Sequence, residues 1–412
     1  MKSLFFKISC IFLLTFLHFN LLSQVNIDVK IDDINDTVLY LIKYKSDKTQ
    51  TIIDTSSTFY TKKTFSNRQN YYEGIYVLAD SKQHPLFEIL IGNDQKFSIH
   101  VKELMDLDSY KVKGCKETSD YFKIYSKTIH ENLYIKALES ELKHNPKNRQ
   151  KIDSIAKHLY EYQESMLRKN KTSFLNTYIK FIEKKTVTQY FEDLPLNDTR
   201  ILNSRLLKNK LDEYFNIYMS EQNPDVICQN IDNLISKANE CKEVRDYTLW
   251  YLYSKYFNND FIYIHLSDNY FSKLEINNLT ENIRNEIIKR ADVLRKITIG
   301  CLSPTFSYID DNGNHIDLDK INGKHIVLFF YKPDCQKCIR DKRILESVKK
   351  RQKDLTILYI NISEENYSNV SHDIINQYDI TTTPTIYLLN ENKEIIAKHI
   401  KAEEIEFHII KR

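Results

Sequence analysis

The order of apolar and polar residues predicts short strands in the first part of the chain. Residues 25–29 alternate apolar and polar side chains, and the runs at 38–42 and 86–91 are largely apolar. A period of two is typical of strands with one buried face, and polar clusters between such runs are typical of turns. We therefore predict a small antiparallel β-rich domain over residues 24–116.

Helical periodicity follows in the middle of the chain, where Ile152, Ile155 and Leu159 recur at the spacing of one helix face. All six glycines lie outside residues 115–299, and a long stretch without this helix-weakening residue favours helices. We predict an α-helical middle domain over residues 117–297, with about five to seven packed helices. Its many Tyr and Phe residues are expected in the core rather than in a ligand site.

The last part of the chain alternates strand-like and helix-like segments. Residues 326–331 form an apolar run that predicts a buried strand, and a helix-forming segment at 339–350 follows it after a loop. Further strands and helices are predicted, in chain order, at 356–362, 370–378, 385–389, 394–398 and 402–411. The resulting order β-α-β-α-β-β-α predicts an α/β domain over residues 298–412, so the fold class is multidomain.

The amino terminus is typical of an export signal. Lys2 and Lys7 flank the start of an apolar run at residues 8–17, which is too short for a bilayer core that needs about 20 apolar residues. We predict a signal peptide over residues 1–23 and no stable membrane span after its cleavage, with an uncleaved anchor as the alternative. Cys10 precedes most of the apolar run, whereas a lipidated cysteine would follow it.

The charge balance excludes one class of partner. The chain has 59 Lys and Arg against 56 Asp and Glu, so it has no strong basic excess. Binding to nucleic acids depends on such an excess, and we expect no nucleic-acid partner.

Six cysteines follow the predicted signal peptide, and only Cys335 and Cys338 form a C-x-x-C motif. Cys228 and Cys241 lie in one predicted helical stretch, about 20 Å apart along a continuous helix, which is too far for a disulfide. We expect buried free thiols at these two positions. The remaining cysteines, which we expect to be unpaired, are Cys115 and Cys301.

The C-x-x-C motif lies at the junction between a predicted strand and the helix that follows it. Free amides in a first helical turn and the helix dipole stabilise a thiolate at this position. Residues 332–343 carry an excess of three positive charges that acts in the same direction, although the adjacent Asp334 opposes it. Cys335 is therefore the candidate nucleophile.

Metal binding and peroxidase chemistry are the alternatives for such a cysteine pair. A structural zinc site needs a second pair of Cys or His ligands, and the sequence has none at zinc-finger spacing. Copper binding could recruit the loop residue His372, but a single histidine is weak support. A peroxidatic cysteine would favour a hydroxyl residue three positions earlier, where this sequence has Lys332. We expect no metal and no cofactor.

Residues 298–412 resemble the thioredoxin-like thiol-disulfide oxidoreductases, especially their exported TlpA/ResA-like branch. Besides the strand, C-x-x-C motif and helix, the resemblance rests on residues 300–304 (Gly-Cys-Leu-Ser-Pro), 311–313 (Asp-Asn-Gly) and 383–385 (Thr-Pro-Thr). It implies that Cys335 attacks a substrate disulfide and that Cys338 resolves the mixed disulfide. The pair Thr383 and Pro384 would present backbone to the substrate beside the sulfurs.

Three positions depart from the family pattern. Asp334 stands where the family usually has an aromatic residue, Phe329 where thioredoxins keep a buried carboxylate, and Arg343 where the branch has a proline. In that branch a glutamate three residues after the second cysteine can accept a proton, and Asp341 occupies this position. The resemblance implies that Asp341 is the proton shuttle for Cys338, whereas the alternative is a surface aspartate paired with a neighbouring lysine.

Residues 112–118 and 196–204 resemble parts of exported Bacteroidota-type proteins in which β-rich and helical domains precede such an oxidoreductase. The resemblance implies a location in the periplasm or cell envelope. The implied partners are protein thiols and disulfides of the envelope and an unidentified redox partner. It implies no role for residues 24–297.

We therefore expect an exported enzyme that reduces or isomerises disulfides of envelope proteins through Cys335 and Cys338. The rival is an envelope binding or assembly protein whose thioredoxin-like domain senses redox state without turnover. The residues between the cysteines do not fix the direction of exchange, because redox potential depends on how strongly the thiolate is stabilised.

Overall fold

The computed structural model describes residues 24–34, 36–44, 50–59, 62–169, 171, 173–183, 186–363 and 372–410. The predicted signal peptide, residues 1–23, lies outside the described residues. The chain divides into two compact units, Met1–Tyr247 and Thr248–Arg412. The domain limits expected after residues 116 and 297 stay predictions.

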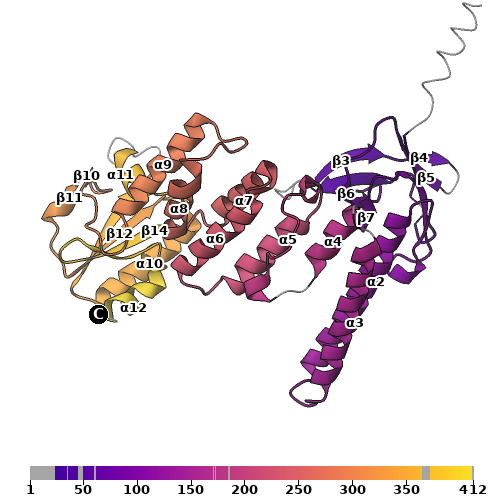
Figure 1. The fold of residues 1–412 in the computed structure, drawn as a ribbon. Coiled ribbons are helices and arrows are strands. Elements are labelled where there is room, and N and C mark those ends of the chain that lie inside the picture. The colour runs from indigo at the N-terminus through magenta and orange to yellow at the C-terminus, as the bar shows by residue number, and fades with distance from the viewer. Residues whose placement is uncertain are drawn as a thin grey trace, which may run out of the picture. The chain divides into compact units, whose positions relative to one another are not determined.

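Two β-sheets begin the first unit, as the alternating pattern predicts (Figure 1). One sheet has the strand order β4-β5-β1-β8-β9 and the other β3-β2-β6-β7. Their neighbouring strands pair antiparallel, except that β1 and β8 pair parallel. Along β1 the side chains of Val25, Ile27 and Val29 are buried, so the period of two in the sequence is the period of burial. The strands are β1 (Val25–Ile31), β2 (Tyr40–Tyr44), β3 (Gln50–Thr55), β4 (Ser57–Phe59), β5 (Lys62–Asn67), β6 (Gly74–Ala79), β7 (Pro85–Ile91), β8 (Lys96–Val101) and β9 (Lys111–Lys113).

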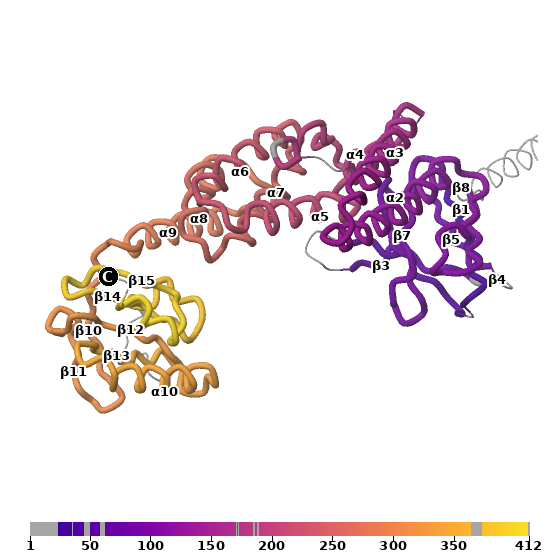
Figure 2. Tube along the Cα trace, turned by 90° about the horizontal axis from the view of Figure 1, so that it is seen from below, coloured from indigo at the N-terminus to yellow at the C-terminus, as the bar shows by residue number. Residues whose placement is uncertain are grey.

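Helices follow the two sheets, and the long helices α2 and α3 lie side by side (Figures 1 and 2). The described part of residues 116–297 contains eight α-helices rather than the five to seven expected. The estimate was too low because α4, α5 and α8 have only nine, eight and seven residues and thus few periodic positions. The helices are α2 (Lys116–Ser140), α3 (Asn148–Lys169), α4 (Phe174–Ile182), α5 (Leu206–Glu213), α6 (Pro224–Ala238), α7 (Lys242–Lys255), α8 (Asp260–Leu266) and α9 (Glu281–Lys296).

A four-stranded sheet with the order β13-β12-β14-β15 forms the centre of the second unit. β12 pairs parallel with β13, whereas β14 pairs antiparallel with both β12 and β15. A small hairpin of β10 and β11 precedes the sheet. This arrangement confirms the predicted α/β domain. Its elements are β10 (Ser307–Ile309), β11 (His315–Asp317), β12 (His325–Tyr331), α10 (Gln336–Arg351), β13 (Leu355–Asn361), α11 (His372–Gln377), β14 (Thr385–Asn390), β15 (Ile395–Lys398) and α12 (Ile405–Ile410).

The strand β12 is buried on both faces, as its continuous apolar run predicts. Phe329 belongs to the core cluster that includes Cys338 and Leu345 of α10. The ring of the adjacent Phe330 instead contacts Tyr378 and Tyr387. Phe329 is fully buried in this apolar cluster. β12 therefore has an aromatic ring at the position where thioredoxins keep a buried carboxylate.

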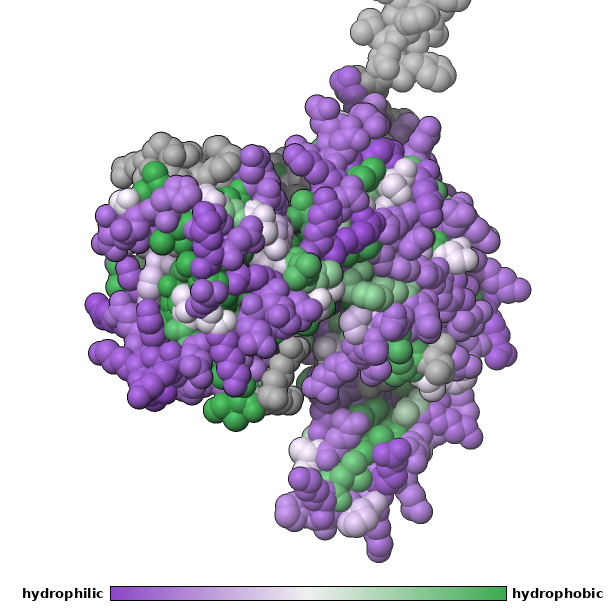
Figure 3. Space-filling view, turned by 90° about the vertical axis from the view of Figure 1, so that its left-hand side faces the viewer, coloured by the Kyte–Doolittle hydropathy of each residue, from purple (hydrophilic) through white to green (hydrophobic). Residues whose placement is uncertain are grey.

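The surface carries few continuous apolar areas on the face drawn in Figure 3, where apolar side chains form small scattered groups among hydrophilic ones. Among the helices in the described part of the chain, none is long and apolar enough to cross a membrane.

Arg290 joins α9 to the segment that follows α11. Its Nε and Nη2 each donate to one carboxylate oxygen of Asp379 at 2.8 Å, and its Nη1 donates to the carbonyl oxygen of Phe257 at 2.9 Å. The guanidinium also lies over the rings of Phe257 and Tyr263, at 3.7 and 4.4 Å from their centroids. The side chains of the ion pair are only 14% and 10% exposed, so neither charge is well solvated without the other.

Arg290→Ala should therefore lower the free energy of unfolding of the second unit by about 3 kcal/mol, because it leaves the buried charge of Asp379 without its partner. Denaturant unfolding followed by tryptophan fluorescence measures this loss. The chain's only tryptophan, Trp250, lies in this unit with its ring 5.2 Å from that of Phe271.

Arg295→Ala is the matched control, because Arg295 pairs with Asp268 and Asp292 on the exposed surface of the same unit. We expect this variant to lose less than about 1 kcal/mol. Equal losses in the two variants would contradict the structural importance of the Arg290 contact.

Candidate functional site

The C-x-x-C motif lies where β12 ends and α10 begins, as the sequence predicts. Cys335 is the N-cap residue of α10, with extended backbone angles of φ −82° and ψ 109°, and Cys338 lies in the first turn. The two residues form a disulfide with a Cα–Cα distance of 5.2 Å, which is within the usual range for this bond. The strand-to-helix junction thus holds both sulfurs within bonding reach.

The two cysteines differ in exposure. Cys335 is half-buried, whereas Cys338 is 1% exposed and packs in the core beneath α10. The backbone amide of Cys338 donates to Sγ of Cys335 at 3.2 Å. A thiolate at Cys335 would accept the same hydrogen bond at the positive end of the helix dipole. The geometry therefore favours Cys335 as the sulfur that ionises and reacts first.

Thr383 and Pro384 lie beside this outer sulfur, although they are far from it in the sequence. The peptide bond between them is cis, and the carbonyl oxygen of Thr383 lies 3.8 Å from Sγ of Cys335. The proximity follows from strand pairing, because Thr385 at the start of β14 pairs with Phe330 near the end of β12. The structure brings these residues together as expected, and their role in substrate binding stays a prediction.

Asp341 lies three residues after Cys338 in α10, so both side chains lie on neighbouring positions of one helix face. Its side chain is 3% exposed, and its Oδ1 lies 2.9 Å from Nη2 and 3.0 Å from Nε of Arg340. The alternative of a surface aspartate paired with a lysine is therefore wrong, because the carboxylate is buried and its partner is an arginine. Its role as a proton shuttle stays a prediction.

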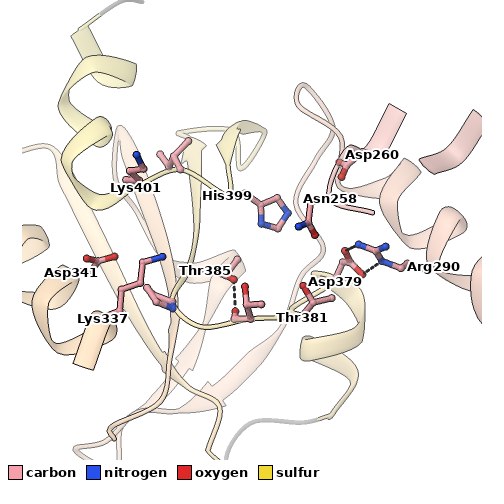
Figure 4. A pocket seen from close by; sticks show the side chains of 13 residues that line it. Asn258, Asp260, Arg290, Lys337, Asp341, Asp379, Thr381, Thr385, His399 and Lys401 are labelled. Atoms are coloured by element: carbon pink, nitrogen blue, oxygen red, sulfur yellow. Dashed lines mark hydrogen bonds and ion pairs between the residues drawn. The ribbon is translucent and has the colours of Figure 1, made fainter. Parts of the chain in front are cut away.

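A pocket of about 350 Å³ opens beside the C-x-x-C motif, and we call it the side pocket (Figure 4). Lys337 and Asp341 of α10 lie on one side of it in the figure. Asn258, Arg290 and Asp379 lie on the other side, with the ion pair between the last two drawn as dashed lines. Pro384, the proline of the cis peptide bond, also lines it, so the side pocket extends to the segment beside Cys335.

Sequence reasoning missed the far wall of the side pocket. Its residues come from three separate segments, at 258–260, 290 and 379, and no short motif links them. The only local pattern at these positions is the cluster of Asn and Asp before α8. Such a cluster is typical of the start of a helix and does not indicate a pocket. Asn259 indeed caps that helix by accepting a hydrogen bond from the amide of Ile262 at 3.1 Å.

His399 and Lys401 line the side pocket from the segment after β15. The pKa of His399 lies below its usual value, first because its surroundings desolvate the ring and second because the charge of Lys398 is adjacent. The ring of His399 is therefore neutral near pH 7. Lys337 and Lys401 are both exposed, in contrast to the acidic residues of the pocket.

The other cysteines of the described chain are free thiols. Cys228 and Cys241 are buried, as predicted, and desolvation raises the pKa of Cys228 to about 11 and raises that of Cys241 as well. Cys115 is buried and Cys301 is half-buried. In the described residues, only the C-x-x-C pair therefore combines two bonded sulfurs with an exposed face.

Comparison with known proteins finds one family and several solved structures that are similar to parts of this chain. The family described as thioredoxin-like domain matches residues 314–405, and no curated protein matches the chain. A thioredoxin-like protein from Bacteroides caccae is 20% identical, covering 55% of this chain and 91% of its own, with a TM-score of 0.45. The thioredoxin domain of a thiol-disulfide oxidoreductase from Bacteroides vulgatus is 21% identical, covering 28% of this chain and 96% of its own, with a TM-score of 0.24.

The sheet with its flanking helices, the C-x-x-C disulfide at a strand-to-helix junction and the adjacent cis-proline define a thioredoxin-like fold with a thiol-disulfide site. Residues 314–405 accordingly match the thioredoxin-like domain family.

Proposed function

We propose that this protein reduces or isomerises disulfides of cell-envelope proteins, with Cys335 as the attacking and Cys338 as the resolving cysteine. The observation that supports this proposal most strongly is the environment of Cys335 Sγ. It is partly exposed, it accepts a hydrogen bond from the first-turn amide of Cys338, and it lies 3.8 Å from the carbonyl oxygen of Thr383. Such surroundings stabilise a thiolate and leave it open to a client disulfide.

The reaction begins with the reduced pair. The Cys335 thiolate attacks one sulfur of the client disulfide, so a mixed disulfide forms and the other client sulfur leaves as a thiolate. The Cys338 thiol then loses its proton and attacks Cys335 Sγ, which releases the second client sulfur. The client gains two electrons and the protein keeps the Cys335–Cys338 disulfide. In isomerisation the released client thiolate instead attacks a different client disulfide and frees another client thiolate. A client thiolate then attacks the client sulfur of the mixed disulfide and releases the Cys335 thiolate, so no net electrons move.

Asp341 is the proposed acceptor for the proton of Cys338. Cys338 is buried, so water has little access to its thiol. The carboxyl group of Asp341, three residues further along the helix, is buried with it, and its Oδ1 lies 2.9 Å from Nη2 of Arg340. Proton transfer to such a group would speed the resolving step.

We further propose that the protein is exported and that a second protein keeps its cysteine pair reduced. Lys2, Lys7 and the apolar run at 8–17 support a signal peptide over residues 1–23, and thus a location in the periplasm or cell envelope. Each reduction leaves the cysteine pair oxidised, so a separate thiol-bearing redox partner must return two electrons to it.

Replacement of each active cysteine should have a different effect on reduction of a protein disulfide. Cys335→Ser should reduce insulin turnover to background, because the attacking sulfur is lost. Cys338→Ser should also stop turnover but should accumulate a mixed disulfide between Cys335 and the client. Mass spectrometry of non-reduced samples measures this adduct.

Cys301→Ser is the control for cysteine loss, since Cys301 is half-buried and unpaired in the same unit. It should retain turnover. An unaltered protein that binds envelope proteins without reducing any disulfide would contradict the enzymatic proposal and favour a binding or assembly function.

Asp341→Asn should slow the resolving step by about 100-fold, the low end of the usual contribution of a general base. The attacking step should change far less, so the mixed disulfide should accumulate transiently in rapid-quench experiments. Asparagine keeps the size of the side chain, which limits structural damage in the buried site.

The matched control for this prediction is Glu346→Gln, which removes an exposed carboxylate from the same helix. Its resolving rate should equal that of the unaltered protein. Equal resolving rates in Asp341→Asn and Glu346→Gln would exclude Asp341 as the proton acceptor.

A further inference from the structure

The side pocket is built jointly by the thioredoxin-like domain and by the helices that precede it in the second unit. Lys337 and Pro384 come from the redox site itself, whereas Asn258, Asp260 and Arg290 come from the segment of α8 and α9. The pocket is lined by Lys337, one of the two residues between the cysteines, and by Pro384, which follows Thr383 beside Cys335 Sγ. A client residue next to the attacked cysteine would therefore lie close to it.

Each acidic residue of the side pocket already has a cationic partner. Asp379 binds Arg290 through two hydrogen bonds of 2.8 Å. Asp341 binds Arg340 at 2.9 Å. Asp260 forms an ion pair with Lys398, and the two side chains are 18% and 9% exposed. The negative charges of the pocket are thus neutralised within the protein itself.

Two cations of the pocket are left without such a partner. Within the described residues, no ion pair joins Lys337 or Lys401 to a carboxylate, and both residues are exposed. The neighbouring Asn258 and the hydroxyls of Thr381 and Thr382 are neutral hydrogen-bonding groups. The two exposed lysines of the pocket therefore lie beside neutral hydrogen-bonding groups, and the nearby carboxylate of Glu404 accepts a hydrogen bond from the backbone amide of Lys401 at 2.9 Å.

We propose that the side pocket receives an acidic side chain next to the attacked cysteine of a client protein, with Lys337 and Lys401 as its counter-charges and Asn258 as part of the opposite wall. This inference rests on the proposed disulfide exchange and adds the class of client sequence that the site prefers. Its size fits this role, since about 350 Å³ is ample for one carboxylate side chain. The α8–α9 segment then contributes to client selection as well as to stability.

The test uses three synthetic peptides that each contain one disulfide loop and differ only in the residue after the first cysteine, which is Glu, Gln or Lys. The measured quantity is the second-order rate constant for reduction of each peptide by the reduced full-length protein under single-turnover conditions. The Glu peptide should react about two- to fivefold faster than the Gln peptide, and the Lys peptide should react most slowly. The preference should shrink near 1 M salt, where the screening length is about 3 Å.

Two variants locate the preference in the side pocket. Lys401→Gln should move the ratio of the Glu and Gln rate constants towards one, and Asn258→Asp should do the same by adding a negative charge to the far wall. Lys350→Gln is the matched control, because it removes an equally exposed charge from the distant end of α10. It should keep the ratio of the unaltered protein.

The possible results separate this inference from the proposed function. Equal rate constants for the three peptides, or an unchanged ratio in both Lys401→Gln and Asn258→Asp, would overturn the inference while leaving disulfide exchange intact. No reduction of any peptide would overturn the proposed function itself. Glutathione disulfide carries its own carboxylates, and a Lys401→Gln effect confined to this small disulfide would assign the pocket to a small molecule and overturn the role in protein clients.

Discussion

The whole site depends on one constraint, the abrupt change from β12 to α10 at Cys335. Because the helix begins directly after this residue, the amide of Cys338 points at the Cys335 sulfur, at 3.2 Å, and the helix dipole acts on the same atom. Pairing of β14 with β12 then brings the Thr383 carbonyl oxygen to 3.8 Å from the same sulfur. Two backbone groups, the amide of Cys338 and the carbonyl of Thr383, thus lie against the sulfur of the proposed nucleophile.

The side chains around the two cysteines differ in their exposure to solvent. The side chains of Phe329 and Cys338 are buried in the core between β12 and α10. Those of Cys335 and Lys337 are partly or fully exposed to solvent. This division gives the two chemically identical cysteines different access to solvent, and different access suits an attacking and a resolving role. The side chain of Asp341 is 3% exposed and lies between these two sets, because it also lines the side pocket.

The sequence predicted the elements of the second unit well because their patterns are local. Each pattern can be recognised within a few consecutive residues, as in the apolar run of β12, the C-x-x-C motif and the Thr383-Pro384 pair. The far wall of the side pocket was not predictable, because Asn258, Arg290 and Asp379 meet only through tertiary packing. The burial of Asp341 was not predictable for the same reason, since residues near 381–401 share its pocket, although its partner Arg340 is its neighbour in the sequence. The spacing of apolar residues also predicted too few helices, because the short helices α4, α5 and α8 contain few periodic positions.

The most direct test of the account is the ionisation of Cys335 in the reduced full-length Cys338→Ser variant, followed by ultraviolet absorbance of the thiolate against pH. The unaltered backbone amide still faces the sulfur in this variant. The account predicts a midpoint well below the value of about 8.5 for a free cysteine. A midpoint at or above that value would contradict activation of Cys335 by the junction of β12 and α10.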